Sequence, residues 1–150
     1  MLKLYRHEGG RVTAYHEAWV DGETVVEHWG ILGEQGSVRK HRLRTDLTQE
    51  ENIQRVLSQA TSQGFQPIDI DDHKILLIEY PVEGMGTVTD LERRHAMEER
   101  MRELMGWTGL GTCDGGSIGS GTMEVCCFVV DFETAKRCQP QPSHAAVIGA

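Results

Sequence analysis

Long apolar stretches are missing from this sequence of 150 residues. The longest uninterrupted apolar run, Val125 to Val130, has only the length of a strand, whereas a membrane-spanning helix needs about 20 apolar residues. The first residues, MLKLYRHEGG, lack the apolar segment of a secretory signal peptide. We therefore expect a cytoplasmic protein with no membrane partner.

Short-spaced ligand pairs for a metal ion are missing as well. None of the four cysteines belongs to a C-x-x-C pair, and the seven histidines form neither H-x-H nor H-x-x-x-H. Closed zinc sites usually show such pairs. In an extended strand, Cys126 and Cys127 point to opposite faces. The sequence thus favours reduced, partly buried thiols, with no metal site and no cofactor.

No catalytic constellation stands out either. Cys113 and His95 are residue types that act as nucleophile and base in enzymes, but nothing in their spacing favours that role. His16 and His28 lie on neighbouring predicted strands, where they could pair across the strands. A satisfied surface imidazole is the expected state of each. We therefore predict a protein without catalytic residues.

An excess of positive charge is also lacking. The net charge is −8, with eight basic against ten acidic residues in residues 1–70 and seven against thirteen in residues 71–150. Nucleic-acid binding is driven mainly by neutralisation of phosphates, so an acidic chain is a poor match for nucleic acid in bulk. A basic protein partner fits this charge better.

The first half predicts four strands followed by a helix. Apolar and polar residues alternate, as they do in half-buried strands, and glycine-containing turns separate the alternating runs. Thr48 and Glu51 have the spacing of a capping box, and Gly64 stands where a helix commonly ends. The expected strands lie near residues 2–8, 12–20, 24–32 and 37–43, and the helix spans 48–63.

The second half predicts the order β-α-β-β-α-β. Thr89 and Glu92 suggest a second capping box, and Gly106 suggests the end of that helix. This order is that of the ferredoxin-like motif, an antiparallel sheet with two helices on one face. The fold class is therefore α+β, with one unit over residues 1–70 and another over 71–150. The expected elements are strands at 74–80, 109–113, 123–130 and 145–148, and helices at 89–105 and 132–138.

One stretch of the first half carries a family resemblance. Trp29-Gly30-Ile31-Leu32-Gly33-Glu34-Gln35-Gly36 is followed by a basic strand and by a helix that ends in Gly64-Phe65. Over residues 2–70 the chain resembles the WGR domain. In poly(ADP-ribose) polymerases such domains touch DNA ends, and they also occur in bacterial regulators. Ile31 stands where the family motif has arginine, which weakens the nucleic-acid role that the resemblance implies.

The second half carries a weaker resemblance, confined to residues 109–130. This stretch is similar to small bacterial ferredoxin-like proteins of unknown function, some of which are encoded beside toxin immunity genes. The eighty residues after the WGR-like part leave no room for a transferase domain, so the resemblance to the polymerases implies no enzymatic activity.

A dense run of basic residues over 38–44 is the first candidate binding site. Alternation along the strand puts Lys40, Arg42 and Arg44 on one face. Arg39 and His41 lie on the opposite face. A solvated strand edge is the competing interpretation, because Lys and Arg also protect edges from aggregation. Trp29 is more often a core aromatic than a stacking platform. The candidate residues are Trp29, Arg39, Lys40, His41, Arg42 and Arg44.

The glycine-rich segment 114–121 is the second candidate. Backbone N–H groups of such loops can hold phosphate, but a phosphate loop normally leads from a strand into a helix. Here the segment joins two predicted strands, so a mobile hairpin loop is the preferred interpretation. The candidate ligand residues are Gly115, Gly116, Ser117 and Gly119.

Together these features predict a non-catalytic binding or adaptor protein of the immunity or regulatory type. Its expected partner is a protein, and a basic surface on that partner could meet the acidic residues of the second half's long helix. Nucleic-acid binding through strand 38–44 is the alternative, and a small ligand or minor enzymatic activity at segment 114–121 is the third. Packing of the two small units, or a homodimer through a sheet edge, would offset their small cores.

Overall fold

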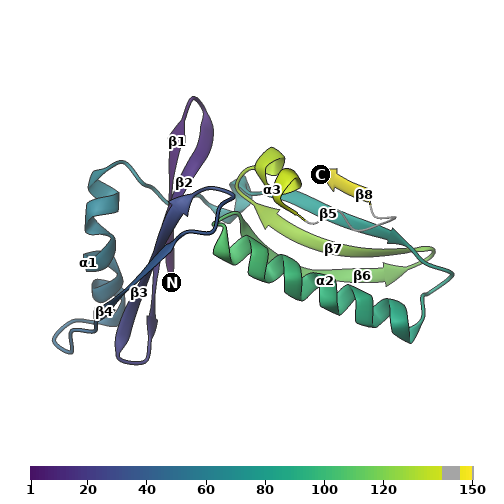
Figure 1. Ribbon diagram of the computed structural model, residues 1–150, viewed down its shortest axis with the longest axis horizontal. Coiled ribbons are helices and arrows are strands. Elements are labelled where there is room, and N and C mark those ends of the chain that lie inside the picture. Colours follow the sequence, from purple (N-terminus) through teal and green to yellow (C-terminus); the bar gives the residue numbers. More distant parts are fainter. Residues whose placement is uncertain (140–145, 150) are drawn as a thin grey trace.

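The chain folds as an α+β protein with two antiparallel sheets, which confirms the predicted fold class (Figure 1). The structure is a computed structural model that describes residues 1–139 and 146–149. Within these residues, no helix is long and apolar enough to cross a bilayer.

The first sheet is a meander in which each strand pairs with the next along the chain. Gly22 has a φ of 60°, the left-handed conformation that the predicted tight turn requires. All four predicted strands and the helix are present. They are β1 (Leu2–Glu8), β2 (Arg11–Asp21), β3 (Thr24–Ile31), β4 (Ser37–Arg42) and α1 (Gln49–Ser62).

Helix α1 begins at the predicted capping box and packs one apolar face on this sheet. The Thr48 hydroxyl accepts a hydrogen bond from the Glu51 backbone N–H, and the Glu51 carboxylate accepts one from the Thr48 backbone. Leu57 and Ala60 are buried against sheet residues that include Ala18. A groove remains open between α1 and the sheet.

The second sheet has the strand order β6-β7-β5-β8, and every pair in it is antiparallel. With its helices it follows the predicted β-α-β-β-α-β sequence of elements. Met101 and Ala135, one from each helix, belong to the same core cluster. The elements are η1 (Ile70–Asp72), β5 (Lys74–Pro81), α2 (Val88–Trp107), β6 (Gly111–Gly119), β7 (Thr122–Val129), α3 (Phe132–Cys138) and β8 (Ala146–Gly149).

The capping box predicted from Thr89 to Glu92 is wrong, because α2 begins two residues earlier. The Thr87 hydroxyl accepts from the Asp90 backbone N–H, and the Asp90 carboxylate accepts from the Thr87 backbone N–H at 2.9 Å. Aspartate meets the same need here as the glutamate of the usual motif. Gly106 does not end the helix, which continues to Trp107.

The predicted hairpin loop over residues 114–121 is also wrong. Strand β6 continues to Gly119, so only Ser120 and Gly121 connect it to β7. A bulge between Cys113 and Gly116 accommodates the extra residues of β6. A Cβ atom at Gly116 would collide with the backbone carbonyl of Glu124, so glycine allows the two strands to approach.

The two sheets are joined by a shared core and by hydrogen bonds. Tyr15 from β2 belongs to the same buried cluster as Met105 and Leu110 of the second half. The Gly33 N–H donates to the Thr108 carbonyl at 3.0 Å. Arg11 donates to Asp131 at 2.9 Å. Burial and polar contacts therefore both connect the parts before and after the predicted boundary at residue 70.

Candidate functional site

The basic strand predicted as a binding site forms β4, an edge strand of the first sheet. Its side chains divide between the faces as the alternation predicted. Arg39 lies over the ring of Trp29, and His41 hydrogen-bonds to Glu27, on the face that carries α1. Lys40 and Arg42 are exposed on the other face.

Arg44 lies beyond the end of β4 and is not brought together with the other candidates. Its guanidinium donates to both carboxylate oxygens of Asp46, at 3.1 and 2.6 Å. A hydrogen bond from Arg44 holds the pKa of the Asp46 carboxyl below its ordinary value. The charge of Arg44 is therefore largely balanced where it stands.

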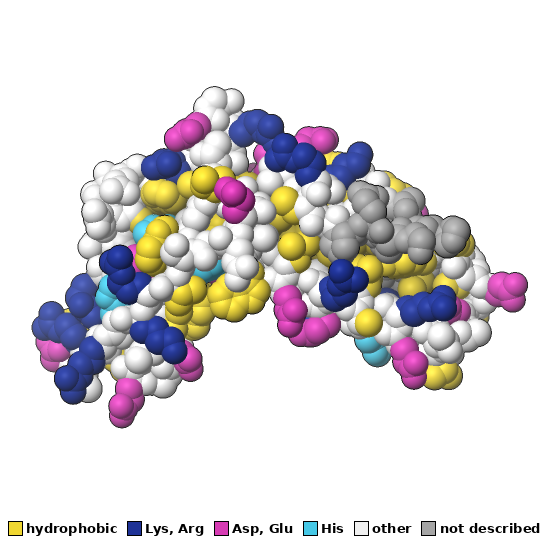
Figure 2. Space-filling view, viewed as in Figure 1, with side chains coloured by type: hydrophobic (Ala, Val, Ile, Leu, Met, Phe, Trp, Pro, Cys, Tyr) yellow, Lys and Arg dark blue, Asp and Glu magenta, His cyan; other side chains and the backbone are white. Residues whose placement is uncertain are grey.

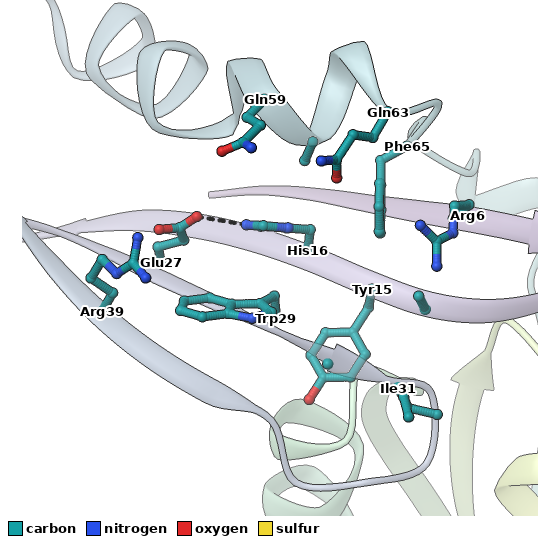
Figure 3. A pocket seen from close by; sticks show the side chains of 13 residues that line it. Arg6, Tyr15, His16, Glu27, Trp29, Ile31, Arg39, Gln59, Gln63 and Phe65 are labelled. Atoms are coloured by element: carbon teal, nitrogen blue, oxygen red, sulfur yellow. Dashed lines mark hydrogen bonds and ion pairs between the residues drawn. The ribbon is translucent and has the colours of Figure 1, made fainter.

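A groove between α1 and the sheet contains Arg39, one of the predicted binding residues. Beside Arg39 lie residues that were not predicted from the sequence (Figure 3). We call it the sheet–helix groove. Its volume is about 450 Å³. Side chains from all four strands, from α1 and from the residues after α1 line it. Its polar and aromatic lining includes Arg6, His16, Trp29, Arg39, Gln63 and Phe65.

Two arginines in the groove stack on aromatic rings. The Arg39 guanidinium carbon lies 5.2 Å from the centre of the Trp29 ring, and that of Arg6 lies 5.1 Å from the centre of Phe65. Both distances are within the range of cation–π attraction. Arg6 also forms an exposed ion pair with Glu8, and its buried Nε has no hydrogen-bond partner in the described residues.

The carboxylate of Glu27, which lines the groove, is hydrogen-bonded to two histidines. His16 Nε2 lies 2.7 Å from one carboxylate oxygen, and His41 Nε2 lies 2.8 Å from the other. Burial alone would raise the pKa of the Glu27 carboxyl, but the hydrogen bonds from His41 and His16 outweigh it and lower the pKa. Glu27 therefore stays ionised and fixes both rings.

His16 and His28 do not pair across the strands, and the surface position expected for His28 is wrong. His16 lies opposite Trp29 in the register, whereas His28 lies opposite Glu17, so the two imidazoles are on opposite faces of the sheet. His28 is fully buried rather than solvated. Its Nδ1 lies 2.8 Å from Glu17, and its Nε2 lies 3.3 Å from the Tyr15 hydroxyl.

Trp29 is half-buried instead of fully buried in the core. Its ring stacks on that of His16, with centres 5.6 Å apart and planes 21° from parallel. A period-two pattern locates the strand that carries Trp29 but cannot reveal how much of the sheet face α1 leaves uncovered. That coverage decides whether the tryptophan lines a cavity.

The second candidate site does not form a ligand loop. Gly115, Gly116, Ser117 and Gly119 lie in β6, where the last three pair with residues of β7. The Ser117 hydroxyl donates to Glu124 at 3.1 Å. Strand pairing thus uses much of the backbone that a phosphate loop would turn toward a ligand.

All four cysteines are free thiols, of which Cys113 and Cys127 are buried. Across residues 1–139 and 146–149, no cluster of three or more His, Cys, Asp or Glu could hold a metal ion. The acidic residues of α2 are interspersed along the helix with Arg93, Arg94, Arg100 and Arg102, and the expected basic partner remains a prediction.

No family model, curated protein or solved structure matches this chain.

Proposed function

We propose that this chain is a non-catalytic binding protein and that its first half binds nucleic acid at the sheet–helix groove and the adjoining strand β4. The stacking of Arg39 on Trp29 and of Arg6 on Phe65 carries the proposal. Guanidinium groups recognise phosphate, and aromatic faces stack with bases. An acidic peptide would use the arginines but has less need of the rings.

The local charge around β4 supports this proposal despite the net charge of −8. Lysine and arginine side chains gather over the end of β4 and the loop that follows it (Figure 2). Glu27 lies among them, but two imidazoles hydrogen-bond to its carboxylate. A local basic surface is what contacts phosphates, whatever the charge of the distant half.

The resemblance to WGR domains also supports nucleic-acid binding, because the motif residue Trp29 lines the groove. Ile31, at the position of the motif arginine, is 63% exposed and supplies no charge. In this chain Arg6 and Arg39 would provide the phosphate contacts. The cytoplasmic location expected from the sequence remains part of the proposal.

Fluorescence anisotropy with labelled single-stranded and duplex DNA tests this function. We expect Arg39→Ala and Arg6→Ala each to weaken binding about tenfold, as loss of a charged hydrogen bond does. Each change should also reduce the salt slope by about one. The matched control is Arg102→Ala, which removes an ion-paired arginine from α2 in the second half and should bind like the wild type. Absence of binding by the wild type at low salt would overturn the proposal.

A second candidate function is the binding of a protein, which could be a second copy of this chain. One face of the second sheet supports this function. The face of this sheet opposite its buried core carries half-buried apolar residues. Cross-strand pairs on this face are Ile75 with Phe128 and Leu77 with Cys126. Sedimentation equilibrium of the wild type and Phe128→Ser tests self-association, and a concentration-independent monomer mass for the wild type would exclude the homodimer.

A further inference from the structure

The shape of the sheet–helix groove points to a narrower ligand than nucleic acid in general. We infer that the groove takes a single unstacked nucleotide, an inference that rests on the proposed function. The groove lies between α1 and the sheet and has a volume of about 450 Å³, within the usual 300–1,000 Å³ of small-molecule sites. Bases inside a duplex are stacked and paired, so a base must leave the stack to enter such a site.

The groove offers a different kind of group to each part of a nucleotide. Trp29 is half-buried and provides an aromatic face that stacks with any base, whereas Phe65 is only 6% exposed and lies beneath the guanidinium of Arg6. Arg39 lies at one end of the groove and Arg6 at the other (Figure 3). Arginines at both ends suit a chain that enters and leaves through its phosphates, with one base between them.

Helix α1 contributes the groups that would meet the edge of the base. Gln59, on α1, and Gln63, which caps the C-terminus of α1, are exposed and lie across the groove from Trp29 (Figure 3). Each carboxamide has two N–H donors and one carbonyl acceptor, which match the mixed edge of a nucleobase. Within the described residues, neither side chain is hydrogen-bonded to another residue, so both are available to a ligand.

The remaining charged groups at the groove are compatible with this ligand. Glu27 is the acidic residue of the lining, and both of its oxygens accept from His16 and His41. Both carboxylate oxygens of Glu27 are therefore already engaged by protein partners. Arg39 is exposed, so its side chain can move from the Trp29 ring toward a phosphate while a base takes its place.

The test uses the full chain and three DNA probes that share one sequence. The first is a blunt duplex, the second is the same duplex with one unpaired terminal 2-aminopurine nucleotide, and the third is a single strand containing 2-aminopurine. We expect the unpaired nucleotide to bind at least about tenfold more tightly than the blunt end, as stacking of one base allows. The fluorescence of 2-aminopurine should fall on binding, because stacking quenches it.

Variants on α1 separate the base contact from a general loss of folding. Gln59→Ala with Gln63→Ala should remove most of the preference for the unpaired nucleotide and leave blunt-duplex affinity within about twofold. Gln54→Ala, on another side of the same helix, is the matched control and should keep the preference. Circular dichroism checks that all variants fold like the wild type.

The outcomes distinguish this inference from the proposed function. Equal affinity for the blunt and unpaired ends, or unchanged 2-aminopurine fluorescence on binding, would overturn the single-nucleotide site but leave nucleic-acid binding in place. Absence of binding to all three probes would overturn the proposed function itself.

Discussion

At the scale of single residues, the Tyr15 hydroxyl lies within hydrogen-bonding distance of three acceptor or donor atoms but has only one proton to donate. Its hydroxyl lies 3.0 Å from the Glu34 carbonyl, 3.1 Å from the Trp107 carbonyl and 3.3 Å from His28 Nε2. A phenol donates one hydrogen bond at a time and accepts others. The neutral hydroxyl is therefore the form that this environment stabilises, because two carbonyl oxygens face it.

Stability above pH 10 should depend on Tyr15. Burial, and then the negative charge of Glu17, raise the pKa of Tyr15 to about 12 from its ordinary 10. The folded state thus retains the proton more tightly than the unfolded chain does. The resulting stabilisation is complete below pH 10 and is lost as the pH rises from 10 to 12.

Urea unfolding at pH 9, 10 and 11 checks this prediction. The wild type should lose stability over this range, and Tyr15→Phe should lose less even though it starts less stable. Tyr5 and Tyr80 also have raised pKa values, so the variant keeps some alkaline sensitivity. An identical pH slope in the two proteins would contradict the assignment to Tyr15.

At the scale of elements, the start of α2 shows how one short motif sets a helix boundary. The sequence contains threonine at both 87 and 89, and each is followed three residues later by a carboxylate. Only Thr87 forms the reciprocal bonds of a capping box. Thr89 is a residue of the first helical turn, and its side chain is exposed.

Thr87→Ala should destabilise the protein by about 1 kcal/mol, because the N-cap hydroxyl satisfies a backbone N–H that has no partner within the helix. Thr89→Ala is the matched control and should be neutral or slightly stabilising, since alanine favours helix interiors. Thermal unfolding followed by circular dichroism measures both. A larger loss from Thr89→Ala than from Thr87→Ala would show that the helix starts later.

At the scale of the whole molecule, Tyr15 and Gly109 bring the two halves into contact. Gly109 has a φ of 70°, and a Cβ atom at this position would overlap the Tyr15 ring. Glycine is therefore required both for the backbone conformation and for the close approach of the first sheet. This contact lies at the end of α2, next to the Trp107 carbonyl that faces the Tyr15 hydroxyl.

Gly109→Ala should destabilise the protein by about 2–3 kcal/mol through backbone strain and overpacking. Gly106→Ala, three residues earlier in α2, meets open space and should instead stabilise slightly. Calorimetry measures both effects and shows whether the halves unfold together. Because the core is shared, we expect one transition in the wild type, and two well-separated transitions would contradict that expectation.

The candidate site was only partly predictable from the sequence. Alternation along β4 correctly separated Arg39 and His41 from Lys40 and Arg42, because side-chain direction in a strand follows from position alone. The involvement of Arg6, Gln59 and Phe65 was not predicted. Each comes from a different part of the chain, and only the packing of α1 on the sheet brings them to one groove.

The sequence by itself determined the local structure: the turns, the capping box at Thr48, the strand alternation and the order of elements. These features depend on residues a few positions apart, so their backbone preferences and spacing can be read directly from the sequence. Only the tertiary structure decided that His28 is buried against Glu17, that the glycine-rich residues 115–119 form part of a strand, and that Tyr15 joins the two sheets. Register and packing bring together residues far apart in the sequence, so no local pattern encodes them.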